Sequence, residues 1–443
     1  MAPMPVPASC SRSLAAALFL LVGACASTPG GNTPTEKAST GATSALPIAS
    51  ISTSSSGPAT LPLAELDFDP STFNFAKNPD LAERVAENAH SYFRFVNKAF
   101  ATAVCRRFAE KMATLPLVRL HGDPHIEQYV ITDLGRGLSD FDDAAVGPPV
   151  IDLARFATSV VLASRVKGFS RADENSLVSE LFRGYRDGLK RTPFPKKAPA
   201  FAAAISASFK KDRKAFIEGA DNAMIAIDQA DEAFLRGEVS EYAKLVTAPK
   251  RAPDFFTVKK LGLLKLGIGS ALVRKYLVRL EGETAAAEDD VLMEVKEISD
   301  LAGVPCMTAI PGGAAEGRAT AQKRAGDKKH LVPLLLDESK GSPTGARRFW
   351  VNEWLANYQE ARIKKLASAD LGPLVYESGL ALAEEHLHDY PGQGGPVKAP
   401  APDKLAISID LEADIRKHSN ELADGIVRGW DRFKRDVPMP PKN

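Results

Sequence analysis

The stretch 119-RLHGDPHIEQYVITDLGRGLSDFDDAAVGPPVIDLAR-155 gathers two histidines and a series of aspartates among short apolar runs. Residues 116–120 and 128–132 have the length and composition of strands, and a third short strand is expected to end at the acidic residues 140–143. Turn-forming residues separate these runs. In residues 151–166 the apolar side chains recur at helical spacing. The stretch therefore predicts a strand-and-turn unit that leads into a helix.

The rest of the chain adds helices and one hairpin to this unit. Residues 272–280 alternate apolar and basic side chains, as a half-buried strand does, and residues 291–298 are expected to be the hairpin partner. Helices are expected at residues 81–112, in one or two pieces, across residues 174–245, and at residues 353–366, 374–390 and 411–436. Helices combined with hairpins predict an α+β protein.

The N-terminal segment has the pattern of an export signal. Arg12 precedes an apolar run at residues 14–22, and the small residues that follow end at Cys25 in a sequence similar to a bacterial lipobox. We expect Cys25 to carry lipid and the protein to be a cell envelope lipoprotein, on the outer membrane or the periplasmic face. An ordinary signal peptide and a buried N-terminal segment are the alternatives. Residues 26–60 are rich in Ser, Thr, Gly, Pro and Ala, and are expected to form a disordered tether.

Length, charge and cysteine content set further bounds. A chain of 443 residues is long enough for two domains or one large two-lobed unit. The net charge of +1 gives no support for nucleic-acid binding, which usually needs concentrated Lys and Arg. Cys105 and Cys306 are the two cysteines outside the export segment, and they could pair in an oxidising compartment. Their spacing does not decide whether they do, and no oligomeric state follows from the sequence.

The acidic residues of the opening stretch suit phosphoryl transfer. This reaction needs one carboxylate to accept a proton from the attacking hydroxyl, oxygen ligands for Mg²⁺, and positive charge on the phosphates. Asp123 lies in a turn between two predicted strands, and Asp140 follows the next hairpin. Mg²⁺ prefers hard oxygen ligands and retains waters, so one or two side chains suffice to hold it. The two carboxylates could therefore act in separate roles.

The string H-G-D-x-H at residues 121–125, followed by D-F-D-D-A at 140–144 and G-P-P-V-I-D-L-A at 147–154, resembles the catalytic and metal-binding loops of aminoglycoside phosphotransferases, relatives of protein kinases. With D-L-A-R at 152–155, these motifs resemble more closely an uncharacterised bacterial family, domain of unknown function 2252, over most of residues 80–390. The resemblance implies a protein-kinase-like two-lobed fold. It would have a mostly helical large lobe and a small β-rich lobe.

The resemblance also implies roles for single residues. Asp123 would be the catalytic base, His121 would orient its loop, and Asp140 would be the chief Mg²⁺ ligand. Gln128 stands where the phosphotransferase pattern has a metal-binding Asn. Because its amide oxygen sits on a longer stem, the second metal contact is expected to be weakened, shifted or absent. Structural roles are implied for His125, Asp142, Asp152 and Arg155, with Asp152 bracing the catalytic loop from its helix.

A phosphate-covering loop and a lysine are expected after the catalytic loop. Gly267, Gly269 and Ser270 form a G-x-G-S turn that could bring backbone N–H groups close to the phosphates of ATP, and Lys296 follows on the next predicted strand. The uncharacterised family has a similar turn and strand, although Leu272 replaces its usual third glycine. This order implies a circularly permuted kinase-like fold. The expected division is a helical lobe at 61–250, a nucleotide lobe at 251–352 with a mobile loop at 311–329, and C-terminal helices at 353–443.

Two other functions stay open. ATP is scarce outside the cytoplasm, so an exported chain could be a kinase-shaped lipoprotein that binds a ligand without turnover. Alternatively, His121, Asp123 and His125 could hold zinc in a metal-dependent hydrolase, with His386 or His388 as a distant ligand. The substrate cannot be named from the sequence.

Overall fold

The computed structural model describes residues 64–133, 135–246, 257–264, 274–297, 303–309, 334–337, 348–392 and 395–439. Residues 61–443 belong to one compact unit. Several predicted features lie outside the described residues. They are the export segment with Cys25, the tether, the turn with Gly267, Gly269 and Ser270, and the loop at residues 311–329.

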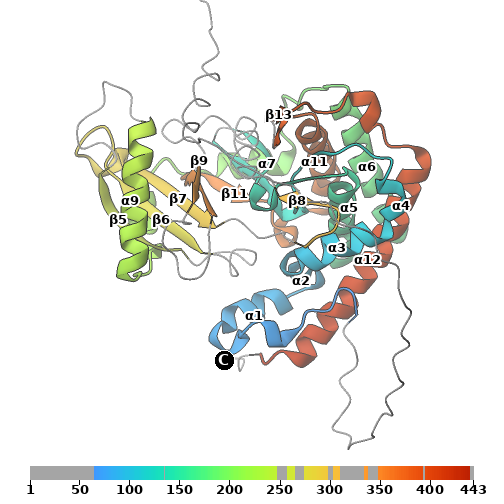
Figure 1. Ribbon diagram of the computed structural model, residues 1–443, viewed down its shortest axis with the longest axis horizontal. Coiled ribbons are helices and arrows are strands. Elements are labelled where there is room, and N and C mark those ends of the chain that lie inside the picture. The colour runs from blue at the N-terminus through green and yellow to red at the C-terminus, as the bar shows by residue number, and fades with distance from the viewer. Residues whose placement is uncertain are drawn as a thin grey trace, which may run out of the picture. The chain divides into compact units, whose positions relative to one another are not determined.

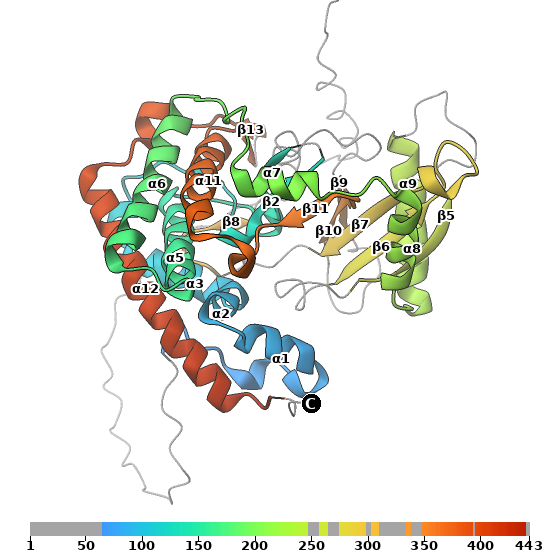
Figure 2. The same ribbon diagram turned by 180° about the vertical axis from the view of Figure 1, so that it is seen from behind.

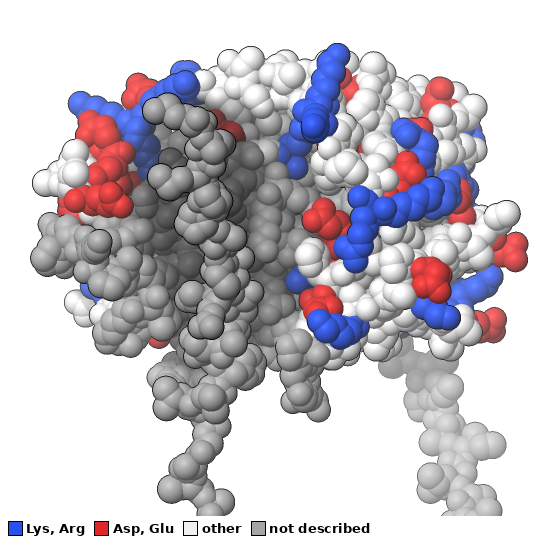
Figure 3. All heavy atoms as spheres, turned by 90° about the horizontal axis from the view of Figure 1, so that it is seen from above, with Lys and Arg blue, Asp and Glu red and all other residues white. Residues whose placement is uncertain are grey.

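The described body is an α+β protein (Figure 1). Its α-helices are α1 (Pro79–Ala86), α2 (Ala89–Phe95), α3 (Asn97–Arg107), α4 (Ala109–Met112), α5 (Val150–Val166), α6 (Arg171–Leu189), α7 (Ala200–Ala207), α8 (Arg213–Ala223), α9 (Gln229–Val246), α11 (Leu371–His386) and α12 (Ile409–Asp436). None of the helices that are described combines the length and apolar content needed to cross a membrane. On the face drawn in Figure 3, Lys and Arg side chains are interspersed with Asp and Glu over the described surface.

Helix α5 lies at the centre of the helical core. Every side chain from Val150 to Ser164 is buried, because this segment is apolar on nearly all sides. Helices α2, α3, α6 and the long α12 pack around it (Figure 2). Helices α6 and α11 approach closely through glycines: a Cβ on Gly184 would lie 2.1 Å from the carbonyl oxygen of Tyr376.

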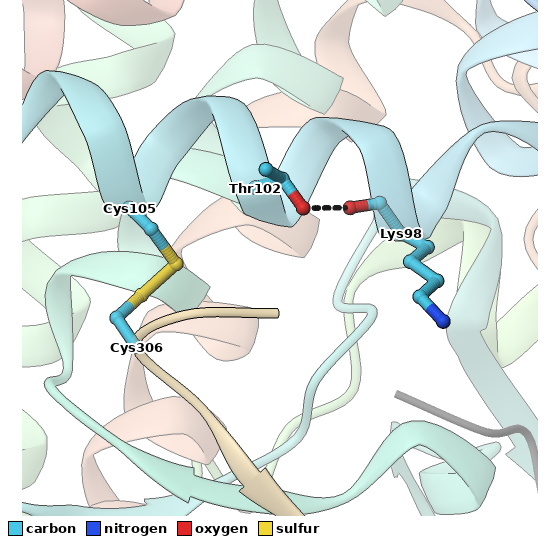
Figure 4. Close-up of a disulfide and its surroundings, with 4 residues drawn as sticks. All are labelled: Lys98, Thr102, Cys105 and Cys306. Carbon is cyan, nitrogen blue, oxygen red and sulfur yellow. Dashed lines mark hydrogen bonds between the residues drawn. A yellow bond between two sulfur atoms is a disulfide. The ribbon is translucent and has the colours of Figure 1, made fainter. Parts of the chain in front are cut away.

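Two small antiparallel sheets cover this core. One has the order β11 (Tyr358–Glu360), β2 (Tyr129–Thr132), β3 (Arg136–Leu138), and the other has the order β1 (Val118–Leu120), β4 (Ala145–Gly147), β8 (Thr308–Ala309). The predicted strands of the opening stretch are therefore confirmed. Strand β8 joins β4 beside a disulfide that links Cys105 of α3 to Cys306 (Figure 4). The pairing that the sequence left undecided is present.

The larger antiparallel sheet has the order β5 (Val258–Leu263), β6 (Lys275–Leu280), β7 (Val291–Glu297), β10 (Arg348–Glu353), β9 (Leu334–Asp337). The predicted hairpin of β6 and β7 is confirmed. One face is apolar and packs against Leu235 and Val239 of α9. On the other face, Leu277 and Leu292 pack against α8. Helices α8 and α9 thus cover this sheet, although their sequence was assigned to the helical lobe. Strand β8, assigned to the β-rich lobe, pairs with the helical core.

Two predictions of helix are corrected. Residues 79–112 form four helices, α1 to α4, and not one or two. Residues 353–366 are not a helix: Glu353 ends strand β10, and β11 and a short 3₁₀ helix at Ile363–Lys365 follow. Phe349 and Val351 alternate into the sheet core, and β10 pairs with β7 through Glu353. Pairing with distant strands thus overrides the local helical spacing.

A short β-ribbon, β12 (Tyr390–Gly392) with β13 (Gly395–Val397), follows α11.

Candidate functional site

The turn that carries His121 and Asp123 is held by the first turn of α5. Asp152, fully buried, accepts hydrogen bonds from the backbone N–H of His121 (2.7 Å, Oδ2) and of Gly122 (3.0 Å, Oδ1). Gly122 has a left-handed backbone (φ +87°), and a Cβ there would lie 1.8 Å from the carbonyl oxygen of Asp143. The turn therefore presses directly on the acidic loop that follows β3, and only glycine fits the contact.

Asp152 is itself held by two side chains that the sequence interpretation did not connect with it. Nε2 of His386 lies 3.2 Å from Oδ2 of Asp152, and the Tyr185 hydroxyl lies 2.9 Å from Nδ1 of His386. Because the carboxylate can only accept, Nε2 carries the proton and Nδ1 accepts from Tyr185. The sequence suggested His386 as a possible distant zinc ligand, and no local pattern indicates that α5, α6 and α11 meet here.

The ring of His121 joins the two loops of the site. Its Nε2 donates to the carbonyl oxygen of Ser139 (3.0 Å), and its ring centroid lies 4.2 Å from that of Phe141. Nδ1 accepts a long hydrogen bond from the N–H of Asp123 (3.4 Å). These contacts join the turn of His121 to the acidic loop, and the orienting role stays a prediction. Both ring nitrogens of His121 are engaged in these hydrogen bonds, whereas a zinc ligand would need one ring nitrogen for the metal.

Asp123 forms a buried ion pair with Arg155, one turn after Asp152 on α5. Nη2 and Nε of Arg155 lie 2.6 and 2.8 Å from Oδ1 of Asp123, and the guanidinium lies 3.5 Å from the centroid of the Phe93 ring. Burial raises the pKa of the Asp123 carboxyl, and the charge of Arg155 opposes this rise. Within the described part of the chain, Oδ2 of Asp123 accepts no hydrogen bond. One oxygen is thus fixed and the other is available.

Lys296 reaches the acidic loop from strand β7. Its Nζ lies 2.7 Å from Oδ1 of Asp140, 156 positions earlier in the chain, and also contacts Oδ2 of Asp142. The side chains of Lys296 and Asp142 are 6% and 7% exposed, whereas that of Asp140 is 37% exposed. Asp142, expected to be structural, therefore shares the lysine with Asp140.

The backbone of Asp140 is left-handed (φ 67°, ψ 58°), an uncommon conformation for a residue with a side chain. This conformation turns the chain sharply between Ser139 and the short 3₁₀ helix at Phe141–Asp143. Such local strain persists where the surroundings hold it, as His121 and Gly122 do here, and it often marks functional sites.

The face of the large sheet around Lys296 is polar at one end. Glu294 and Lys296 lie on the same side of β7 because side chains alternate along a strand. Glu294 pairs with Lys275 of β6 (2.7 Å), which lies directly opposite Lys296 in the ladder. The connection at residues 265–273 joins β5 to β6 and ends one residue before Arg274, next to Lys275. The residues of the G-x-G-S sequence themselves lie outside the described part of the chain.

Gln128 and His125 are buried near the turn and each has an unpaired atom. Oε1 of Gln128 and Nδ1 of His125 find no hydrogen-bond partner among the described residues. The backbone carbonyl of Gln128 accepts from the N–H of Ser139 (3.0 Å), which places it against the acidic loop. His125 packs against His90, and burial lowers the pKa of both rings, that of His90 to about 3. The two histidines are therefore neutral core residues.

The described residues contain no group of three or more His, Cys, Asp or Glu side chains arranged to hold a metal ion. His121, Asp123 and His125 thus do not converge as a hydrolase ligand set. A Mg²⁺ site needs fewer protein ligands, and carboxylate and amide oxygens are the atoms it prefers. Asp140, partly exposed, and the unpaired amide oxygen of Gln128 fit that requirement.

Comparison with known proteins supports part of the sequence interpretation. No curated protein and no solved structure matches this chain. One family model matches at residues 81–205, less than half of the 443 residues, and the match does not reach Lys296. Over that region, which contains Asp123, Asp140 and Asp152, the chain is therefore similar to the family described as "Uncharacterized protein conserved in bacteria (DUF2252)".

Proposed function

We propose that Lys296, Asp140 and Asp123 form a phosphotransferase centre that uses Mg-ATP and transfers a phosphoryl group to a hydroxyl of an unidentified acceptor. One observation carries the proposal: the ammonium of Lys296 lies 2.7 Å from Asp140, although 156 positions separate them. Phosphoryl transfer depends mainly on positioning and charge, and a lysine beside a metal-binding carboxylate supplies both. This arrangement supports the proposal of a kinase-like centre.

Asp123 would accept the proton of the attacking hydroxyl. Its Oδ2 is the oxygen that the described residues leave unbonded, while Arg155 holds Oδ1 and thereby sets the direction of the carboxylate. Burial raises the pKa of this carboxyl, which makes it a better proton acceptor than an exposed aspartate. His121 and Asp152 keep the turn in place during the reaction.

Asp140 and Gln128 would hold the Mg²⁺ ion, which when bound supplies charge neutralisation at the phosphates. The fit rests on the partly exposed carboxylate of Asp140 and the buried, unpaired amide oxygen of Gln128. Lys296 would then pair with phosphate oxygens, as a compact point charge suits. The connection at residues 265–273, with Gly267, Gly269 and Ser270, is the proposed cover of the nucleotide.

A nucleotide-binding protein without turnover is the second proposal. The observation that favours it is the buried pair of Asp123 with Arg155, because a carboxylate bound to a guanidinium gives up part of its basicity. Gln128, in place of the metal-binding Asn of the phosphotransferase pattern, also favours binding without turnover. The two proposals share a ligand and differ in whether product forms.

Thermal shift with purified residues 61–443 tests both proposals. We expect Mg-ATP to raise the melting temperature of the wild type and not that of Asp140→Ala, because the carboxylate that holds the ion is lost. Glu110→Ala, at an exposed position of α4, is the control and should respond like the wild type. Release of ADP in the presence of hydroxyl acceptors then separates the enzyme from the binder. No shift with any nucleotide would rule out both.

The location at the cell envelope is also a proposal, with Cys25 as the lipid anchor to the membrane. The disulfide of Cys105 with Cys306 supports it, since such bonds persist in oxidising compartments outside the cytoplasm. Mass spectrometry of the N-terminal peptide from membranes should find acylated Cys25. A soluble protein with an intact N-terminal segment would contradict this.

A further inference from the structure

We infer that Lys296 acts as an internal counter-ion that keeps divalent metal out of the centre until a phosphate-bearing ligand draws the lysine away. The inference rests on the proposed function, because it takes Asp140 as the metal ligand. Lys296 contacts both Asp140 and Asp142, so its ammonium occupies the position between the carboxylates where an arriving cation would bind. The ligand-free centre is thus closed by its own side chain.

The charges around Lys296 explain why metal alone is a poor competitor. The ammonium is almost fully buried and contacts the carboxylates of Asp140 and Asp142, and Asp142 is equally buried. A divalent ion that binds Asp140 would stand within a few ångströms of this ammonium. Repulsion between like charges grows with the product of the charges and is little screened at a buried site. Metal can therefore enter only when Lys296 moves to another anion.

The sheet limits where Lys296 can move. Strand β7 lies between β6 and β10, so the backbone of Lys296 is paired on both sides with Lys275 and Trp350. Glu294, two residues earlier on the same face, is engaged by Lys275. Only the side chain can swing, and a phosphate on the ligand would supply the anion that replaces the carboxylates.

Coupling between metal and phosphate follows from this exchange. A tetrahedral anion that pairs with Lys296 leaves Asp140 to the metal, and the metal in turn leaves Lys296 to the anion. Linkage requires each ligand to raise the affinity for the other by the same factor. The centre therefore takes up metal and phosphate together and resists either one alone.

Binding of Mn²⁺ to the purified protein, followed by the electron paramagnetic resonance of the free ion, tests the inference. We expect Lys296→Met to bind Mn²⁺ alone at least tenfold more tightly than the wild type. Sulfate, a tetrahedral anion that stays soluble with Mn²⁺, should raise the affinity of the wild type at least fivefold and that of Lys296→Met less than twofold. Adding Asp142→Asn to Lys296→Met should reduce the gained affinity.

Lys259→Met is the matched control. Lys259 lies on β5 of the same sheet and also bridges two carboxylates, those of Glu281 (2.9 Å) and Asp290 (3.3 Å). Its removal should leave Mn²⁺ binding within twofold of the wild type. Equal gains in both lysine variants, or no gain in Lys296→Met, would overturn the inference.

Other outcomes remain decisive. If the melting curve shows that Lys296→Met does not fold, Lys296→Gln replaces it. If sulfate does not change the Mn²⁺ affinity of the wild type, the inference is overturned without any variant. A gain of Mn²⁺ affinity in Lys296→Met with no ATP binding would refute the nucleotide proposal and retain the counter-ion. If the wild type binds ATP but Lys296→Met gains no Mn²⁺ affinity, the nucleotide proposal is retained and the counter-ion role is refuted.

Discussion

Two carboxylate–cation pairs in the centre differ in how firmly they are held. The pair of Asp123 with Arg155 is buried, and the guanidinium also stacks on Phe93 and donates to its backbone carbonyl (3.1 Å). The pair of Asp140 with Lys296 has one partner that is 37% exposed, and an ammonium on a flexible stem. The first pair is part of the architecture, while the second can open to admit a ligand.

The difference follows from the chemistry of the two cations. A guanidinium is planar and donates several hydrogen bonds in a rigid fork, so its neighbours fix its position. An ammonium is a point charge that exchanges one oxygen partner for another with little loss. We therefore expect the loss of Arg155 to act mainly on the fold. The loss of Lys296 should change ligand binding, and it also leaves the buried Asp142 without this counter-charge.

Removal of Arg155 should have the largest effect on stability. Arg155→Met leaves the Asp123 carboxylate buried without a counter-charge, which costs about 3–5 kcal/mol of the free energy of unfolding. Chemical denaturation measures the loss. Arg236→Met on α9 is the control, because both partners of its pair with Glu232 are exposed and the pair is expected to contribute less than about 1 kcal/mol. A similar small loss for both variants would contradict the distinction between the pairs.

The same variant has a pH dependence with a defined sign. Burial raises the pKa of Asp123 and Arg155 opposes the rise, so the pKa should be higher still in Arg155→Met. A carboxyl with a raised pKa in the folded state loses stability as pH rises through its titration. The penalty of Arg155→Met should therefore shrink at acidic pH, and denaturation across pH measures it.

The disulfide offers the second largest effect. It closes a loop with a sequence separation of 201 and ties α3 to the segment before β8. Reduction should cost about 2–4 kcal/mol, the typical contribution of a disulfide. Melting of residues 61–443 with and without reductant measures this. The melting temperature of the variant with both Cys105→Ala and Cys306→Ala should not change when reductant is added.

His90, which packs against His125 in the core, makes the stability of the protein sensitive to acid. Burial lowers the pKa of His90 from 6.5 to about 3, so as pH falls the unfolded chain takes up a proton before the folded chain does. Stability from this group is present above pH 6.5 and is lost as pH falls toward 3, by roughly 1 kcal/mol at pH 5.5. His90→Asn should flatten the dependence of the unfolding free energy on pH between 7 and 5. An unchanged slope would refute the assignment.

Substitution of Tyr185 should have the smallest effect on stability. It tests the contacts that hold Asp152 beneath the turn of His121. Tyr185→Phe removes the hydroxyl that donates to His386 and leaves a buried acceptor unpaired, at a cost of about 1 kcal/mol. Tyr376→Phe is the control, since its hydroxyl bonds Asp187 (3.2 Å) at a partly buried site. A smaller loss for Tyr376→Phe, in chemical denaturation, supports a role of Tyr185 in holding Asp152.

Local pattern was sufficient for the elements built from neighbours in the chain. Residues 116–166 predicted the strands, the turns and helix α5, because the alternation and turn residues that specify them lie within a few positions. The hairpin of β6 and β7 was predicted for the same reason. Asp152 was expected to brace the turn and does bind its backbone, since helix start and turn are close in sequence. The kinase-like fold and function stay predictions.

Contacts between distant segments could not be predicted, because periodicity carries no information about which elements meet. Residues 353–360 carry a helical pattern and become strands, since β7 and β2 offer edges to pair with. The disulfide, the bond of His386 to Asp152 and the sharing of Lys296 by Asp140 and Asp142 all join far parts of the chain. Composition supplied the reactive groups, and packing of the core chose their partners.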